Sequence, residues 1–583
     1  MNFQNYYILS TMRYLFGFLF CFSFIYTHAQ SPADRWADSV YKQLTPEERI
    51  AQLMIVRLST IDMSTKKVTF YDKQVEELVK KYNVGGVLIF QGGPTQQALA
   101  INKLQKMAKT PIMFSIDGEW GVGQRLFDSV QALPKQMMLG AVSDPAIIYA
   151  YGKAVAEQCK RLGIHVNFAP VVDVNNNAAN PVINDRSFGE NKHTVAAYGI
   201  EYMKGMQDNG VLACAKHFPG HGDVTVDSHY DLPVIKKPFA ALDTLELFPF
   251  KKIFEAGVGS VMIAHLNIPA IDNATNRATS LSSKNVKELL RNTLGYQGLT
   301  FTDALEMKGV QKFFPGGEAA VQSLIAGNDV LCLPLDVPST IQSVQKAIRE
   351  KKLTWDDIEN HCKKILRAKY HYVLHNVQPV QIENLAVDLN RDVPALRQRV
   401  AENAITLLSA SESSFFPLNV RQRVAYVGFG IDGPNAFARR MEKDYNANCF
   451  YFSLNPKNEK ENTEKLLELK RNYDYVIIGV HNTTRSATTN YGIAPGVHSL
   501  IQKISTQQKA VVFHFGNAYA AQKWCALDNL VIAYEDDSIV HEVAADMLNG
   551  KKPYLGKLPV TLCSRFPHGS SASASIEKKN STR

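Results

Sequence analysis

The stretch Val211-Leu212-Ala213-Cys214-Ala215-Lys216-His217-Phe218-Pro219-Gly220-His221-Gly222 joins an apolar run to a group of titratable side chains. Residues 211–215 are apolar throughout, which indicates a buried strand. The residues that follow are interrupted by Pro219, Gly220 and Gly222, which disfavour regular structure. Titratable groups on a Gly/Pro-rich loop after a strand indicate a reactive site rather than a packing element.

Similar apolar runs recur along the first part of the chain. They cover residues 86–90, 112–116, 166–172, 260–264, 299–302 and 329–333, and helical patterns separate them. Continuous apolar strands separated by helices predict a parallel sheet that is covered on both faces. This many units in about 300 residues favour an α/β fold of the (β/α)8 TIM-barrel type over a single open sheet.

Polar residues stand at or just past the carboxyl ends of these runs. They are Asp117, Asp173, Lys216, His217, His265 and Asp303. A single Asp in such a place is as well explained as a helix N-cap. The whole set predicts an active site, because the carboxyl ends of barrel strands meet on one face.

Composition and cysteine usage limit the class of protein. The 583 residues are 45% hydrophobic and 20% charged, which is typical of a globular protein of more than one domain. The net charge of +9 is spread over the whole length without a Lys/Arg run, which argues against a nucleic-acid partner. The cysteines after Cys21 are scattered and never form a CxxC, so we expect buried thiols rather than a disulfide framework or structural zinc.

The start of the chain resembles an export signal. Arg13 precedes an apolar run over residues 14–25, and Ala29 is a small residue suited to cleavage before Gln30. That run is short for a membrane span, so we expect no stable membrane insertion. The sequence therefore predicts a protein that is periplasmic or secreted.

The domain organisation follows from these patterns. We expect a signal peptide at 1–29, a barrel catalytic domain at 30–375, a polar linker at 376–398, a smaller α/β sandwich at 399–566 and a disordered tail at 567–583. Strands of the second domain are predicted near residues 424–427, 449–452, 475–480, 510–515 and 530–534.

Several motifs resemble a known family. Residues 216–222 followed by Asp227-Ser228-His229 resemble the signature of glycoside hydrolase family 3, in its β-N-acetylglucosaminidase (β-hexosaminidase) branch. Residues 116–125 resemble that family's sugar-binding turn, with Trp120 and Gly123 departing from the usual pattern. Residues 185–189, 261–265, 301–307 and 326–329 resemble later barrel motifs, and 515–517 and 556–560 resemble its α/β sandwich. The resemblance spans roughly residues 40–565.

The resemblance implies a retaining exo-β-N-acetylglucosaminidase that needs no metal or organic cofactor. Asp303 would be the nucleophile that forms a covalent glycosyl-enzyme, and His229 paired with Asp227 would be the acid/base. A histidine donates a proton only as imidazolium, so a nearby anion that raises its pKa suits this role near neutrality. The implied sugar-binding residues are Asp117, Arg125, Arg186, Lys216 and His217.

The implied substrate is terminal β-linked N-acetylglucosamine (GlcNAc) on muropeptides or chitooligosaccharides. Phosphorolysis stays open, because a histidine base does not repel phosphate as a carboxylate would. Another family-3 β-glycosidase activity also stays open. From other classes, a metal-dependent hydrolase would use His217, His221 or His229 with nearby aspartates, and an inactive carbohydrate-binding protein is the third alternative. The oligomeric state is not predicted.

Overall fold

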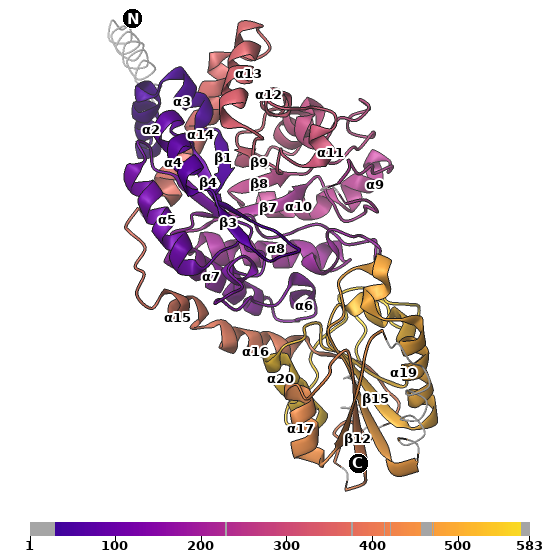
Figure 1. The fold of residues 1–583 in the computed structure, drawn as a ribbon. Helices are drawn as coiled ribbons and strands as arrows, with labels where there is room; N and C mark the ends of the chain where they lie inside the picture. Colours follow the sequence, from indigo (N-terminus) through magenta and orange to yellow (C-terminus); the bar gives the residue numbers. More distant parts are fainter. Residues whose placement is uncertain are drawn as a thin grey trace, which may run out of the picture.

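The computed structural model describes residues 30–227, 230–374, 377–412, 414–419, 421–455, 469 and 471–572. The predicted signal peptide and His229 lie outside the described residues. Within the described ranges the chain forms a sheet of eight strands and a sheet of six, each with its own helices, and a separate two-stranded hairpin (Figure 1). No helix of these ranges combines the length and apolar character needed to cross a membrane.

The large sheet is a parallel barrel, as predicted. Its strands are β1 (Met54–Arg57), β4 (Gly86–Ile89), β5 (Met113–Ile116), β6 (Val166–Asn167), β7 (Leu212–Phe218), β8 (Ser260–Ile263), β9 (Leu299–Thr302) and β10 (Leu331–Cys332). They follow the order β10-β1-β4-β5-β6-β7-β8-β9, and every neighbouring pair is parallel. A parallel bridge between Phe301 and Val330 joins β9 to the residue before β10 and closes the ring. The strands are buried on both faces, which explains their continuous apolar sequences.

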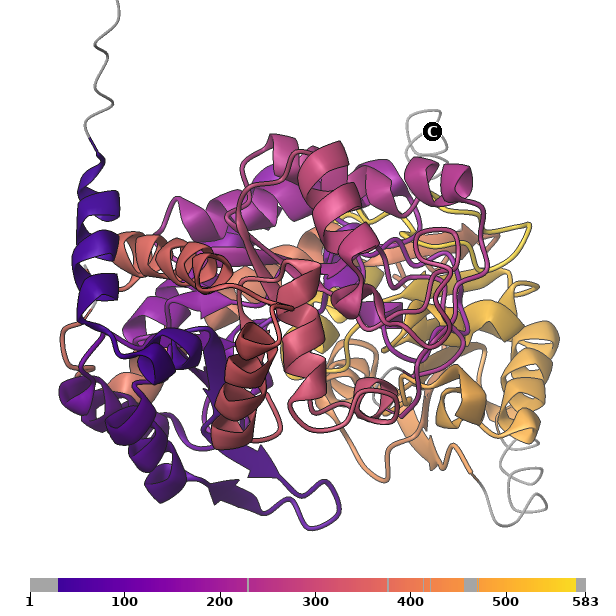
Figure 2. The same cartoon turned by 90° about the horizontal axis from the view of Figure 1, so that it is seen from above.

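Helices surround this barrel. They are α2 (Pro32–Gln43), α3 (Pro46–Ala51), α4 (Asp72–Tyr82), α5 (Pro94–Met107), α6 (Gln136–Gly140), α7 (Pro145–Arg161), α8 (Lys192–Gln207), α9 (Phe239–Thr244), α10 (Leu247–Glu255), the π-helix η4 (Lys284–Thr293), α11 (Lys308–Gln311), α12 (Glu318–Ala326), α13 (Val337–Arg349) and α14 (Trp355–Tyr372). A hairpin of β2 (Ser59–Ile61) and β3 (Val68–Phe70) extends beyond the sheet. From above, the indigo N-terminal helices and the yellow second domain lie at opposite sides of the molecule (Figure 2).

The sequence Thr45 to Met54 predicts the start of an amphipathic helix, with Thr45 as its N-cap and Pro46 as its first residue, and the first barrel strand corrects where that helix ends. Thr45 caps α3 as predicted: its hydroxyl accepts the Glu48 N–H, and Glu48 accepts the Thr45 N–H in return. The helix ends at Ala51, however, and β1 begins at Met54. A helix that continues through Met54 is therefore wrong. The apolar residues after Ala51 pair between β4 and β10, and without them the barrel could not close.

The second domain is a doubly covered sheet of β11 (Thr406–Ala410), β12 (Val424–Phe429), β13 (Asn448–Phe452), β14 (Tyr475–Val480), β15 (Lys509–His514) and β16 (Asn529–Ile532), in the order β11-β16-β15-β14-β12-β13. The helices α16 (Val393–Ala404), α17 (Ala436–Tyr445) and α20 (Ser538–Leu548) lie on one side of it, and α19 (Pro495–Gln507) lies on the other (Figure 1). The edge strand β11, antiparallel to β16, was not anticipated from the sequence.

The segments assigned to a linker and a tail contain ordered contacts. Residues 376–398 include α15 (Leu385–Asn390), where Asp388 accepts a hydrogen bond of 2.8 Å from Arg161 of α7. Residues 567–572 follow the sandwich, and the Ala572 N–H donates to the Leu407 carbonyl over 2.7 Å. The rest of the predicted tail lies outside the described residues.

The cysteines differ from expectation at one place. Cys525 and Cys563 form a disulfide across 38 residues of the second domain, whereas Cys159, Cys214, Cys332 and Cys362 are buried free thiols as predicted. The expectation of a free buried thiol is wrong for Cys525 and Cys563. Chain folding brings two distant cysteines together, and their spacing in the sequence carries no sign of it.

Candidate active site

The carboxyl ends of the barrel strands surround a cavity of about 370 Å³. The structure brings six of the predicted site residues to its lining: Asp117, Arg125, Arg186, Lys216, His217 and Asp303. Asp117 directly follows β5, Lys216 and His217 are among the last residues of β7, and Asp303 directly follows β9. Parallel strands present all these residues on one face.

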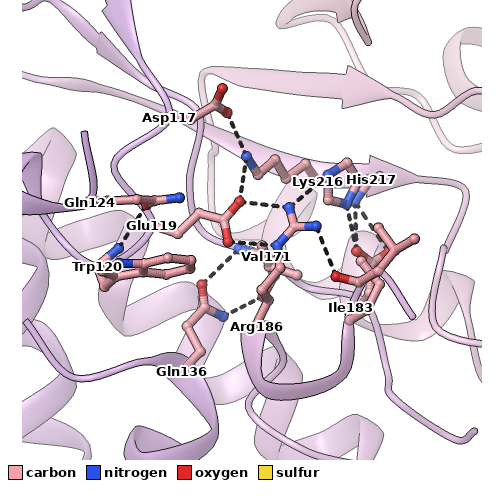
Figure 3. Close-up of polar contacts among 12 residues, drawn as sticks. Asp117, Glu119, Trp120, Gln124, Gln136, Val171, Ile183, Arg186, Lys216 and His217 are labelled. Carbon is pink, nitrogen blue, oxygen red and sulfur yellow. Dashed lines mark hydrogen bonds and ion pairs between the residues drawn. The ribbon is translucent and has the colours of Figure 1, made fainter. Parts of the chain in front are cut away.

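Lys216 lies at the centre of a chain of ion pairs (Figure 3). Its Nζ is 2.9 Å from Asp117 Oδ1 and 2.8 Å from Glu119 Oε1. Arg125 Nη2 donates to Asp117 Oδ2 over 2.9 Å. The Lys216 side chain is only 2% exposed, and burial alone would lower its pKa, but Asp117 and Glu119 raise that pKa above its usual value. Lys216 is therefore held as a cation.

Glu119 pairs with Arg186 at two points. Arg186 Nη2 donates to Oε1 over 2.7 Å and Arg186 Nε donates to Oε2 over 2.9 Å. Burial would raise the pKa of Glu119, but Arg186 and Lys216 hold it well below its usual value. The same holds for Asp117: burial would raise its pKa, but Lys216 and Arg125 keep that pKa below its usual value. Two anions and three cations thus form a fixed, charged wall, able to bind hydroxyl groups as donor and as acceptor.

His217 is oriented by its neighbours. Its Nδ1 lies 2.7 Å from Asp173 Oδ2, and its Nε2 lies 3.3 Å from Arg186 Nη2. The carboxylate only accepts and the guanidinium only donates, so the ring carries its hydrogen on Nδ1 and accepts at Nε2. Asp173 also accepts the backbone N–H groups of His217 and His221. Burial would raise the pKa of Asp173, yet His217 and His221 keep it lowered.

Asp303 is positioned by backbone contacts. Its N–H donates to the Ile263 carbonyl over 2.9 Å, and its Oδ1 accepts the Ala304 N–H over 2.8 Å. His265 fixes the next peptide, because its Nε2 donates to the Ala304 carbonyl over 3.0 Å while its Nδ1 accepts from Ser280. The carboxylate that follows β9 therefore has a defined orientation at the cavity.

The described structure does not test the predicted pairing of His229 with Asp227. Asp227 is not among the lining residues, and its carbonyl accepts the Tyr230 N–H over 3.0 Å. His229 lies outside the described residues. The acid/base pair stays a prediction from the family resemblance.

Four charged lining residues were not anticipated: Arg57, Glu119, Glu306 and Arg485. Glu119 lies within the motif 116–125, whose resemblance could have pointed to it. Arg57 forms an ion pair with Glu306, and burial raises the pKa of Glu306 although Arg57 opposes the shift. Arg485 comes from the loop after β14 in the second domain, and no local pattern in the sequence marks it.

One group of side chains in the described part of the chain has the geometry of a possible metal site. It consists of His481, Asp536 and His541 in the second domain, none of which lines the cavity. Asp536 Oδ1 is 2.9 Å from His481 Nδ1 and 2.7 Å from His541 Nε2. The carboxylate thus already binds both imidazoles, which explains the group as a hydrogen-bonded anchor.

The closed parallel barrel and the charged cavity on its carboxyl face define a TIM-barrel enzyme. The model of the glycosyl hydrolase family 3 N-terminal domain matches residues 45–368. The chain belongs to glycosyl hydrolase family 3.

Relatives and solved structures agree with this assignment. A β-hexosaminidase A of Pseudoalteromonas piscicida is 33% identical over 52% of this chain, which spans 56% of that relative's length. A β-N-acetylglucosaminidase/β-glucosidase of Cellulomonas fimi is 25% identical over 90% of this chain and 95% of its own length. The structure of a family-3 β-N-acetylglucosaminidase from Paenibacillus sp. FPU-7 superposes with a TM-score of 0.73 at 28% identity, over 89% of this chain and 99% of that one.

Proposed function

We propose that the protein is a retaining exo-β-N-acetylglucosaminidase that removes terminal β-linked GlcNAc from muropeptides or chitooligosaccharides. The observation that carries the proposal is that Asp303 lines the same cavity as the ion-paired wall of Asp117, Glu119, Arg186 and Lys216. A sugar held by that wall would present its anomeric carbon to an oriented carboxylate. The similarity to proteins described as β-hexosaminidases and β-N-acetylglucosaminidases supports the substrate class.

In the proposed reaction, Asp303 attacks the anomeric carbon while the leaving oxygen takes a proton. The covalent glycosyl-enzyme is then cleaved by water, so the product keeps the configuration of the substrate. The charged wall holds the sugar hydroxyls during both steps. Because its members are paired with each other, the wall is organised before the substrate arrives.

The proton donor in this proposal is His229, with Asp227 stabilising the imidazolium. This assignment follows the family resemblance of residues 216–229. After the first step the neutral imidazole would accept a proton from the attacking water. Glu306, which lines the cavity and has a raised pKa, is the competing donor among the described carboxylates.

A panel of aryl β-glycosides tests the proposal. The purified protein should hydrolyse aryl β-GlcNAc far faster than the aryl β-glucoside, and the first product should be the β-anomer by NMR. Each assay is run with and without phosphate, because formation of GlcNAc 1-phosphate would identify a phosphorylase instead. Each is also run with EDTA, because loss of activity that a divalent metal restores would identify a metal-dependent hydrolase. No cleavage of any glycoside would refute the proposal.

We also propose that the protein is exported, to the periplasm or beyond the cell. The sequence of residues 1–29 supports this, and so does the Cys525–Cys563 disulfide, because disulfides persist in oxidising compartments. Cell fractionation with amino-terminal sequencing of the mature protein tests it. A cytoplasmic protein that keeps residues 1–29 would contradict it.

A further inference from the structure

Arg485 is the contribution of the second domain to the described lining of the active-site cavity, whose other lining residues belong to the barrel. It lies between β14 and the 3-10 helix η6 (Ala487–Gly492). The proposed mechanism gives it no task. Its charge and its place at the cavity therefore raise the question of what it binds.

The loop that carries Arg485 is firmly held. The Asn482 N–H donates to Asp536 Oδ2 over 2.6 Å, and the Asn482 side chain donates to the Gly430 carbonyl over 2.9 Å. Asp536 is itself fixed by His481 and His541. The loop is closed across Arg485, because the Thr484 N–H before it donates to the Tyr491 carbonyl after it over 2.9 Å. Arg485 therefore reaches the cavity from an ordered support, which lowers the entropic cost of using it as a ligand-binding group.

The guanidinium group uses one of its nitrogens for contacts with the barrel. Nη2 lies 2.7 Å from Asp185 Oδ1, and it donates to the Val182 and Ile183 carbonyls over 3.3 and 3.4 Å. Among the described residues, the hydrogen bonds and ion pairs of Arg485 all involve Nη2. Its Nη1 keeps its N–H groups for a ligand, and a carboxylate can accept a charge-assisted hydrogen bond there.

Exposure places Arg485 at the mouth of the cavity. Its side chain is 44% exposed, whereas the side chains of Arg186 and Lys216 are 13% and 2% exposed. An exo-acting enzyme holds the terminal sugar at the closed end, so its leaving group extends toward the mouth. Arg57 also lies there, but Glu306 in the same cavity neutralises it. Asp185, the partner of Arg485, is shared with Lys135, whose Nζ lies 2.9 Å from Asp185 Oδ2.

We propose that Arg485 forms a subsite that binds a carboxylate on the leaving group of the substrate. The inference rests on the proposed exo-glycosidase activity and extends it to the choice of substrate. Peptidoglycan fragments carry a carboxylate beside the terminal GlcNAc, on the lactyl group of a peptide-free N-acetylmuramic acid or on the peptide of a muropeptide, and chitooligosaccharides carry none. The subsite therefore favours acidic peptidoglycan fragments over neutral chitooligosaccharides.

The test compares two disaccharides that differ only in charge: GlcNAc β1,4-linked to N-acetylmuramic acid, and the methyl ester of its lactyl carboxylate. Arg485→Gln should lower kcat/KM for the acid about tenfold and leave the ester unchanged, since a charge-assisted hydrogen bond contributes about that much. Arg485→Lys should restore part of the loss. Arg423→Gln is the matched control, because Arg423 pairs with Asp474 on the same domain and does not line the cavity.

Two results would overturn the proposal. Equal losses on acid and ester would mean that the role of Arg485 is structural, to hold the backbone of residues 182–183. No loss on either would mean that the side chain is not used. Free phosphate offers the same chemistry, so an effect of Arg485→Gln confined to phosphate-dependent product would assign the subsite to phosphate and refute the leaving-group assignment.

A binding measurement separates failure of this inference from failure of the proposed function. Calorimetry with the Asp303→Asn variant measures affinity for the acid and the ester without turnover. Tighter binding of the acid that is lost with Arg485→Gln supports the subsite even if the wild-type protein cleaves neither disaccharide. Equal affinities for the two ligands contradict it even if both are cleaved.

Discussion

Arg186 and Glu119 face each other in a two-point ion pair, with Nη2–Oε1 at 2.7 Å and Nε–Oε2 at 2.9 Å. The pair joins the loop after β6 to the turn after β5, and Lys216 extends it to β7. The buried Glu119 anion thus links three segments that are distant in sequence. This anion lines the cavity that we propose to bind the sugar.

Glu119→Gln should damage both folding and activity. The amide keeps the shape of the side chain but removes the charge that Arg186 and Lys216 share. Breaking a buried ion pair from one side costs roughly 3–5 kcal/mol, so the free energy of unfolding should fall by about that amount. We expect kcat/KM to fall about 100-fold, because the cations would no longer be held in place.

Denaturant unfolding and steady-state kinetics on aryl β-GlcNAc check both effects. Glu190→Gln is the control, since Glu190 binds Thr561 outside the cavity. A Glu119→Gln variant with wild-type stability and activity would show that the pair is dispensable.

Asp303→Asn should abolish turnover and leave the fold intact. The amide oxygen can still accept the Ala304 N–H, so the local geometry at the end of β9 has no reason to change. An amide is a poor nucleophile, and kcat should fall at least about a thousandfold. Thermal unfolding should match the wild type within a degree or two. Retention of about a tenth of the activity would exclude Asp303 as the nucleophile.

A strand could be predicted from the sequence only where polar residues flank its apolar run on both sides. Runs such as those of β5 and β9 stand alone between polar segments and were recognised. β1 was hidden, because its apolar residues follow α3 after two residues and continue the helical pattern. β11 was hidden in the same way behind α16. In both cases tertiary pairing, rather than local propensity, decides where the helix ends.

The site was predictable where its residues follow strands. Asp117, Lys216, His217 and Asp303 come together because parallel strands share one carboxyl face. Arg485 reaches the cavity only through the packing of the second domain against the barrel. That contact depends on the relative placement of two folded units, for which one sequence carries no local pattern. The Cys525–Cys563 disulfide was not predicted because the folding of the second domain, rather than the spacing of its cysteines, brings the two together.

His229→Ala should distinguish leaving groups. Loss of the proton donor should slow cleavage of natural disaccharides strongly and slow cleavage of activated aryl glycosides little, because a good leaving group departs without a proton. Glu306→Gln is the informative comparison, since Glu306 lines the cavity and its pKa is raised by burial. Kinetics on a series of aryl β-GlcNAc substrates with different leaving groups measures the effect. If Glu306→Gln shows the selective loss and His229→Ala does not, Glu306 is the acid.

Asp227→Asn should move the alkaline limb of the pH–rate profile. In the proposed pair the Asp227 anion stabilises the imidazolium of His229, so removing the charge should lower the pKa of the ring. Activity should then fall off at a pH lower by about one unit or more, because the acid form is lost earlier as pH rises. The measurement is kcat/KM against pH for both proteins with a poor leaving group. An unchanged alkaline limb would remove Asp227 from the acid/base pair.

Lys369 should make stability depend on pH in the alkaline range. Its side chain is fully buried in α14, where Nζ donates to Gln52 Oε1 over 2.7 Å, and burial lowers its pKa to about 7. In the unfolded chain the pKa of the same group is near its ordinary value of 10.5. Between these values the unfolded state binds more protons, so stability rises with pH, by up to about 1.4 kcal/mol per unit. Below pH 7 the lysine is charged in both states and the dependence disappears.

Lys369→Met should remove this dependence. The difference in unfolding free energy between the wild type and the variant should increase by about 2–3 kcal/mol in favour of the wild type from pH 7 to pH 9. Urea unfolding at several pH values measures it. Lys346→Met is the control, because Lys346 is exposed beside Glu350 and should leave the slope unchanged. Parallel stability curves for the wild type and Lys369→Met would show that Lys369 keeps its ordinary pKa in the folded protein.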